Sequence, residues 1–134
     1  MANTPKGWMM LGDRDYDSAA FLAANMRPKP LEIICFHCQQ AVEKYLKGFL
    51  ALQDVDPPYT HDLIELGKLC EKYNASFSAI GGMCDSITLY GVQPRYDSGM
   101  SITEAETSLV LKHAQAIKVF LQKEAPQLFQ SAPG

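Results

Sequence analysis

The sequence lacks a long hydrophobic run, a secretory leader pattern and an excess of positive charge. No apolar segment approaches the roughly 18 residues that a membrane-crossing helix needs, and residues 1–7 lack the basic and apolar blocks of a signal peptide. Its 12 Lys and Arg residues are outnumbered by 15 Asp and Glu residues, which gives a net charge of -3. This balance argues against a surface that binds nucleic acid over its whole extent, although local basic patches stay open. We expect a cytoplasmic protein without membrane contact.

The sequence lacks a converging set of metal ligands, because its four cysteines do not form a metal-binding pattern. Cys35 and Cys38 are separated by two residues with His37 between them, but structural zinc commonly takes two such pairs. Cys70 and Cys84 are isolated. Helical spacing places Cys35 and Cys38 on the apolar side of their segment, with His37 pointing away. The sequence therefore predicts buried free thiols, no metal site and no cofactor.

Helical periodicity runs through the 134 residues, without a convincing strand, repeat or low-complexity segment. About five helices are predicted, so the expected fold is an all-α, up-and-down helical bundle in a single domain, 1–134. The predicted segments are a first helix from Thr4-Pro5 to the break at 27–30, a second at 31–53, a third capped by Thr60 and running to Tyr73, a fourth at 76–89, and a last one after a capping box at 103–106. The core is expected at about 5–124, with a frayed tail at 125–134.

The second predicted helix carries two stripes on opposite sides. Its apolar side comprises Ile34, Cys38, Ala41, Val42, Tyr45, Phe49 and Leu52. The other side, here called the polar stripe, comprises His37, Gln40, Lys44 and Lys47. Lysines one turn apart can hold phosphate oxygens, and the amide of Gln40 can orient a ligand. The alternative is a solvated face on which Glu43 and Lys47 form an i,i+4 ion pair.

Two further segments carry side chains suited to chemistry. His61, at the entrance of the third helix, could transfer protons near neutral pH, or it could bond a neighbouring carbonyl and close the turn. In the loop after the fourth helix, Arg95 could clamp a phosphate and Tyr96 could stack on a base. Arg95 could equally pair with an acid and fix the loop.

In order and spacing, these segments resemble a HEPN domain, the helical module named for higher eukaryotes and prokaryotes nucleotide-binding, over about residues 8–123. The residues that carry the resemblance are Trp8, Asp15, Ala19 and Leu22, then Phe36, Gln40-Ala41, Glu43-Lys44 and Leu46-Lys47, then Thr60-His61-Asp62-Leu63, then Leu89 to Arg95-Tyr96-Asp97, and Ala105, Ala114 and Ile117. The resemblance implies a bundle that commonly forms a homodimer. It also implies a minimal nucleotidyltransferase as partner, in a two-component or toxin–antitoxin system.

Some proteins of that family are metal-independent ribonucleases, and others are non-catalytic subunits that bind a nucleotide or a partner. The ribonucleases carry an Arg followed a few residues later by a His, whereas after Arg95 this chain has no histidine until His113. The resemblance therefore implies a non-catalytic binding protein whose ligand-binding residues are the polar stripe, Arg95 and Tyr96. The alternative is a ribonuclease toxin with a rearranged site, in which Arg95 holds the RNA phosphate and His61 or His37 moves protons. A scaffold for interactions alone is a third interpretation.

Overall fold

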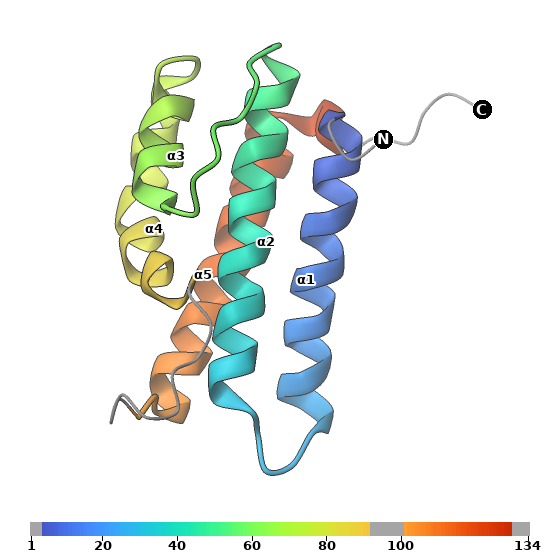
Figure 1. Cartoon of the computed structure of the whole chain (residues 1–134), viewed down its shortest axis with the longest axis vertical. Helices are drawn as coiled ribbons and strands as arrows, with labels where there is room; N and C mark the ends of the chain where they lie inside the picture. Colours follow the sequence, from blue (N-terminus) through green and yellow to red (C-terminus); the bar gives the residue numbers. More distant parts are fainter. Residues whose placement is uncertain (1–3, 92–100, 130–134) are drawn as a thin grey trace, which may run out of the picture.

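The computed structural model describes residues 4–91 and 101–129, and these residues form an all-α bundle without strands. Its helices are α1 (Pro5–Asn25), α2 (Leu31–Leu52), α3 (Leu63–Glu71), α4 (Gly81–Thr88) and α5 (Glu104–Glu124), and short 3-10 segments lie at Ala75–Ile80, Leu89–Gly91 and Pro126–Leu128. Figure 1 shows α2 between α1 on one side and α3 with α4 on the other, and α5 behind it. The predicted fold class is confirmed.

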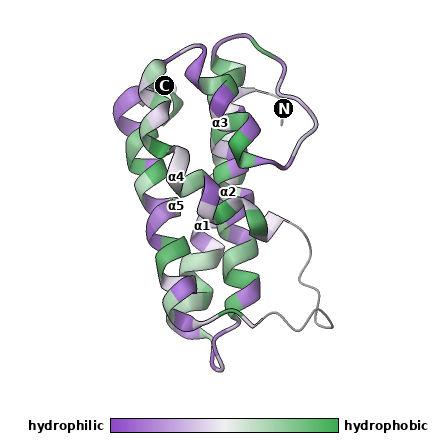
Figure 2. Ribbon diagram, turned by 90° about the vertical axis from the view of Figure 1, so that its left-hand side faces the viewer, coloured by the Kyte–Doolittle hydropathy of each residue, from purple (hydrophilic) through white to green (hydrophobic). Residues whose placement is uncertain are grey.

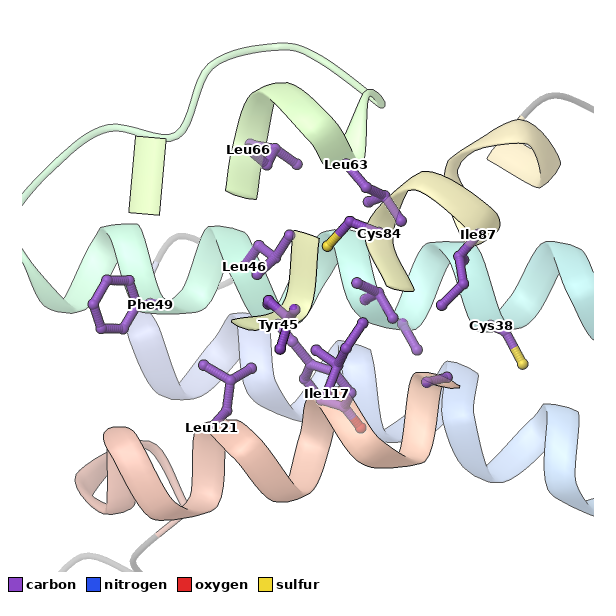
Figure 3. Close-up of a cluster of buried hydrophobic side chains, with 14 of the residues drawn as sticks. Cys38, Tyr45, Leu46, Phe49, Leu63, Leu66, Cys84, Ile87, Ile117 and Leu121 are labelled. Atoms are coloured by element: carbon purple, nitrogen blue, oxygen red, sulfur yellow. The ribbon is translucent and has the colours of Figure 1, made fainter. Parts of the chain in front are cut away.

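Helix α2 occupies the centre because it is buried on almost every side. Every residue from Tyr45 to Leu50 is buried, and a helix covered all round must be surrounded by others. Figure 3 shows the buried side chains that gather around it, among them Leu46 of α2, Leu63 of α3 and Ile117 of α5. Hydrophobic and hydrophilic residues alternate along the outer helices in Figure 2, as expected for helices with one covered face and one open face. No helix in the described ranges is both long and apolar enough to cross a bilayer.

Helices α1 and α2 approach each other closely through a glycine. A Cβ at Gly12 would lie 2.7 Å from the ring of Tyr45, so only glycine leaves room for that ring. The Tyr45 hydroxyl donates to Asp13 Oδ1 at 2.6 Å, and Lys118 of α5 reaches the same oxygen at 3.0 Å. The close approach brings the polar side of α2 against α1 instead of leaving it open to solvent.

Local sequence sets several helix ends. The predicted cap at Thr4 is confirmed by its bond from the Gly7 N–H, and the capping box of Thr103 and Glu106 is also present. The predicted Thr60 cap is wrong, because the backbone is still extended at Asp62, with φ −83° and ψ 110°. Asp62 therefore caps α3, and the Thr60 hydroxyl accepts from the Asp62 N–H.

Two other boundaries differ from the prediction. The expected helix at 76–89 divides at Ile80, whose backbone has left the helical region, into a 3-10 segment and α4. Its apolar positions still face the core, since Phe77 and Ile87 are buried. The frayed tail expected from residue 125 is also wrong for the described part, because Leu128 is buried and the Phe129 ring lies 6.5 Å from the Tyr45 ring. Residues 130–134 lie outside the described ranges.

Candidate functional site

The first half of the polar stripe converges on a carboxylate of α1. His37 Nδ1 lies 2.9 Å from Asp15 Oδ1, and Lys44 Nζ forms a close ion pair with Asp15 Oδ2. All three side chains are partly covered, with 29% of His37, 22% of Lys44 and 14% of Asp15 exposed. Asp15 therefore neutralises the more exposed lysine of the stripe. We call these three residues the Asp15 cluster.

The second half of the stripe is buried with its counterion. Lys47 Nζ lies 3.1 Å from Glu43 Oε2, which confirms the predicted i,i+4 pair, but the side chains are only 8% and 6% exposed. The Lys47 ammonium also lies 5.7 Å from the centroid of the Trp8 ring, a cation–π contact. The indole Nε1 of Trp8 is buried and has no hydrogen-bond partner among the described residues. The solvated setting expected for the pair is therefore wrong, because α1 covers it.

Glu43 also holds the loop before α3. Its Oε1 lies 2.9 Å from His61 Nδ1, although the His61 side chain is 74% exposed. His61 thus bonds a buried carboxylate instead of a neighbouring carbonyl. This arrangement fixes the imidazole at the surface above the Glu43–Lys47 pair. We call Glu43, Lys47 and His61 the Glu43 cluster.

Gln39 is a site residue that the sequence interpretation missed. It is fully buried, and its Nε2 donates to the His61 carbonyl at 2.8 Å. Its Oε1 accepts from Gln40 Nε2 at 2.8 Å, so Gln40 of the stripe is joined to the Glu43 cluster. A Cβ at Gly91 would lie 2.8 Å from Gln39 Nε2, so the last 3-10 turn before residue 92 packs against this amide. The sequence could have indicated Gln39 through its position, since it lies four residues before Glu43 on the same face of the helix.

The remaining expected site residues, Arg95 and Tyr96, lie in 92–100, outside the described residues, so their placement beside the stripe stays a prediction. The four cysteines are all buried and free, as predicted. Burial raises the pKa of Cys38 and the pKa of Cys84 to about 12. Within the described ranges no group of His, Cys, Asp and Glu side chains is arranged to hold a metal ion.

The geometry defines an all-helical domain with a central helix whose cations are paired with carboxylates. The HEPN domain family model matches residues 6–124, from the start of α1 to the end of α5. The chain therefore belongs to the HEPN family, and this membership supports a nucleotide- or RNA-related function in general. Neither the curated proteins nor the solved structures contain a match to this chain.

Proposed function

We propose that this HEPN domain is a non-catalytic binding subunit, which forms a homodimer and acts with a minimal nucleotidyltransferase in a two-component or toxin–antitoxin system. The observation that supports this proposal is the charge pairing of the polar stripe. Lys44 is neutralised by Asp15, and Lys47 by Glu43. A phosphate would have to displace these carboxylates, so the pairing disfavours the stripe as an open phosphate site and favours a subunit that docks its protein partner on a surface outside the stripe.

The nucleotide part of the proposal depends on the Asp15 cluster. Lys47 is enclosed between Glu43 and Trp8 and is only 8% exposed, so it stabilises the bundle and does not meet a ligand. Lys44 is 22% exposed and can reach a phosphate by leaving Asp15. Asp15 then competes with the phosphate for Lys44, and its negative charge lowers the affinity of the domain for a nucleotide.

Calorimetry with ATP tests this competition. Asp15→Asn removes the competing charge and should strengthen ATP binding, whereas Lys44→Met should weaken it. Lys112→Met on α5 is the control, because Lys112 is exposed and has no ion pair among the described residues. Equal ATP affinity in all three variants and the wild type would exclude Lys44 as a phosphate ligand.

Docking is tested by identifying a minimal nucleotidyltransferase encoded beside the gene of this chain and mixing the two proteins. Sedimentation velocity should show a complex heavier than either protein alone. The absence of a complex, together with no ATP binding at millimolar concentration, would overturn the proposed function.

A ribonuclease activity is the second candidate, and the Glu43 cluster is the observation that favours it. A buried carboxylate that fixes an exposed imidazole at 2.9 Å is the usual support of a general base. In this candidate, His61 moves the proton and Arg95 holds the RNA phosphate. Expression should then arrest growth and degrade RNA, and both His61→Ala and Arg95→Ala should relieve these effects, while His113→Ala should not. Harmless expression with intact RNA would eliminate this candidate.

A further inference from the structure

The outer face of α1 carries four exposed side chains in a symmetric order. Met10 is 63% exposed and Phe21 is 65% exposed, and Arg14 and Asp17 lie exposed between them. Their spacing of four, three and four residues places all of them on one face of the helix. We call them the α1 stripe. Together with other residues of α1 and His37 of α2, they line a shallow hollow of about 800 Å³.

The two charges at the centre of the α1 stripe have no ion-pair partner among residues 4–91 and 101–129. The same helix pairs its other carboxylates inside the molecule, Asp13 with Lys118 and Asp15 with Lys44. Arg14 and Asp17 form no such pair, although they have opposite charges and are three residues apart. An unpaired cation and an unpaired anion side by side suit a partner that presents an anion and a cation in the reverse order.

We propose that this partner is a second copy of the chain, whose α1 lies antiparallel to the first across the α1 stripe. The midpoint of positions 10 and 21 lies between residues 15 and 16. The midpoint of positions 14 and 17 lies at the same place. A two-fold axis through that point places Met10 opposite the partner's Phe21 and Arg14 opposite the partner's Asp17. Each contact then occurs twice, as an interface between two identical surfaces requires.

The spacing of the stripe supports a pair of helices. Alternating steps of four and three residues form the seam of a coiled coil, whose side chains meet in layers along the contact. In the antiparallel register, the two central layers are ion pairs and the two outer layers join a thioether to an aromatic ring, a favourable contact. A partner of unrelated sequence would require neither this symmetry of charge nor the matching apolar ends.

The surface is accessible for such a contact. Helix α1 forms one side of the bundle in Figure 1, packed mainly against α2. The contact of two helices is small for a protein interface, so we expect a dissociation constant in the micromolar range. This inference rests on the homodimer of the proposed function and assigns a surface to it.

Charge reversal with exchange tests the register. Arg14→Glu places an anion opposite the partner's Asp17, and Asp17→Arg places a cation opposite the partner's Arg14, so like charges face each other in both central layers. In sedimentation equilibrium, each variant alone should show a dissociation constant at least about tenfold above the wild type. An equimolar mixture of the two variants should dimerise again, because every facing pair across the interface is then of opposite charge.

Matched controls carry the same charge changes elsewhere. Lys112→Glu on α5 and Asp85→Arg on α4 alter exposed residues that have no ion pair in the described part of the chain, and they should dimerise like the wild type. Thermal unfolding by circular dichroism should be nearly the same for all variants, because the altered side chains are exposed. A variant pair that fails to associate on mixing, although each member is folded, would overturn the antiparallel register.

The interface and the proposed function fail in different ways. A wild-type chain that stays at 14.9 kDa across the micromolar range but still binds the nucleotidyltransferase overturns only the α1 interface. If Arg14→Glu abolishes that binding in a monomeric chain, the stripe belongs to the nucleotidyltransferase and not to a second copy. A dimer that responds to charge exchange but binds neither nucleotidyltransferase nor ATP supports the interface and overturns the function.

Discussion

Replacing Lys47 with methionine separates the structural role of the polar stripe from ligand binding. The change removes an ammonium from a buried ion pair while nearly keeping the length of the side chain. Glu43, whose side chain is 6% exposed, keeps its contact with His61 but loses the lysine. Removing one member of a buried pair costs about 3–5 kcal/mol, and because Glu43 retains hydrogen bonds we expect about 3 kcal/mol. At this chain length, that loss should lower the melting temperature by about 10 °C.

Urea unfolding of a double-mutant cycle measures the pair itself. Lys47→Met, Glu43→Gln and the double variant should be strongly non-additive, with a coupling of about 2 kcal/mol or more, because the double variant leaves no unpaired charge in the core. The exposed Lys112→Met control should stay within about 0.5 kcal/mol of the wild type. If Lys47→Met unfolds at the wild-type urea concentration, or if the cycle is additive, the buried pair does not stabilise the bundle as argued.

Other predictions test packing, ionisation and helix capping. Gly12→Ala should lower the unfolding free energy by about 1–3 kcal/mol, since its Cβ would meet the Tyr45 ring at 2.7 Å. Gly82→Ala, with open space around its Cβ, should instead gain about 0.5–1 kcal/mol. An equal effect of the two changes in urea unfolding would refute the close-packing argument. Burial raises the pKa of the Cys38 thiol from 9.0 to about 12, so the fold favours the protonated thiol. Its contribution to stability is complete below about pH 9 and declines as the pH rises toward 12, and Cys38→Ala should therefore show a shallower decline of unfolding free energy over that range. Thr103→Ala removes the capping box and should cost about 1 kcal/mol in the same assay; an unchanged midpoint would show that the cap is dispensable.

The features predicted correctly from sequence depend on neighbours along the chain. A cap such as Thr4 or Thr103 bonds a backbone N–H within the next turn, so its partner is fixed by sequence distance. The burial of Cys38 follows from the periodicity of one helix. The prediction of Thr60 as the cap was wrong because Thr60 and Asp62 both suit the capping position. The backbone at Asp62 is extended, so the helix begins after Asp62 and not after Thr60.

The candidate site could be predicted only in part, because its character depends on contacts between helices. The polar stripe was correctly located on α2, but nothing in the second helix indicates that Asp15 of the first will face Lys44. Helical periodicity treats one helix at a time and so predicted an open face. The covering by α1 arises from the close approach at Gly12, which is a property of the packed pair. The roles of Arg95 and Tyr96 stay predictions.

The chain contains a single tryptophan, and Trp8 lies against the ammonium of Lys47 where α1 meets α2. Its fluorescence therefore arises from one place in the bundle, and no dye is needed to observe that junction. Separation of α1 from α2 would expose the indole to water and move its emission to longer wavelength. Docking on the opposite face of α1 would leave the emission nearly unchanged. The wavelength of one natural fluorophore thus distinguishes a partner that opens the bundle from one that rests on its surface.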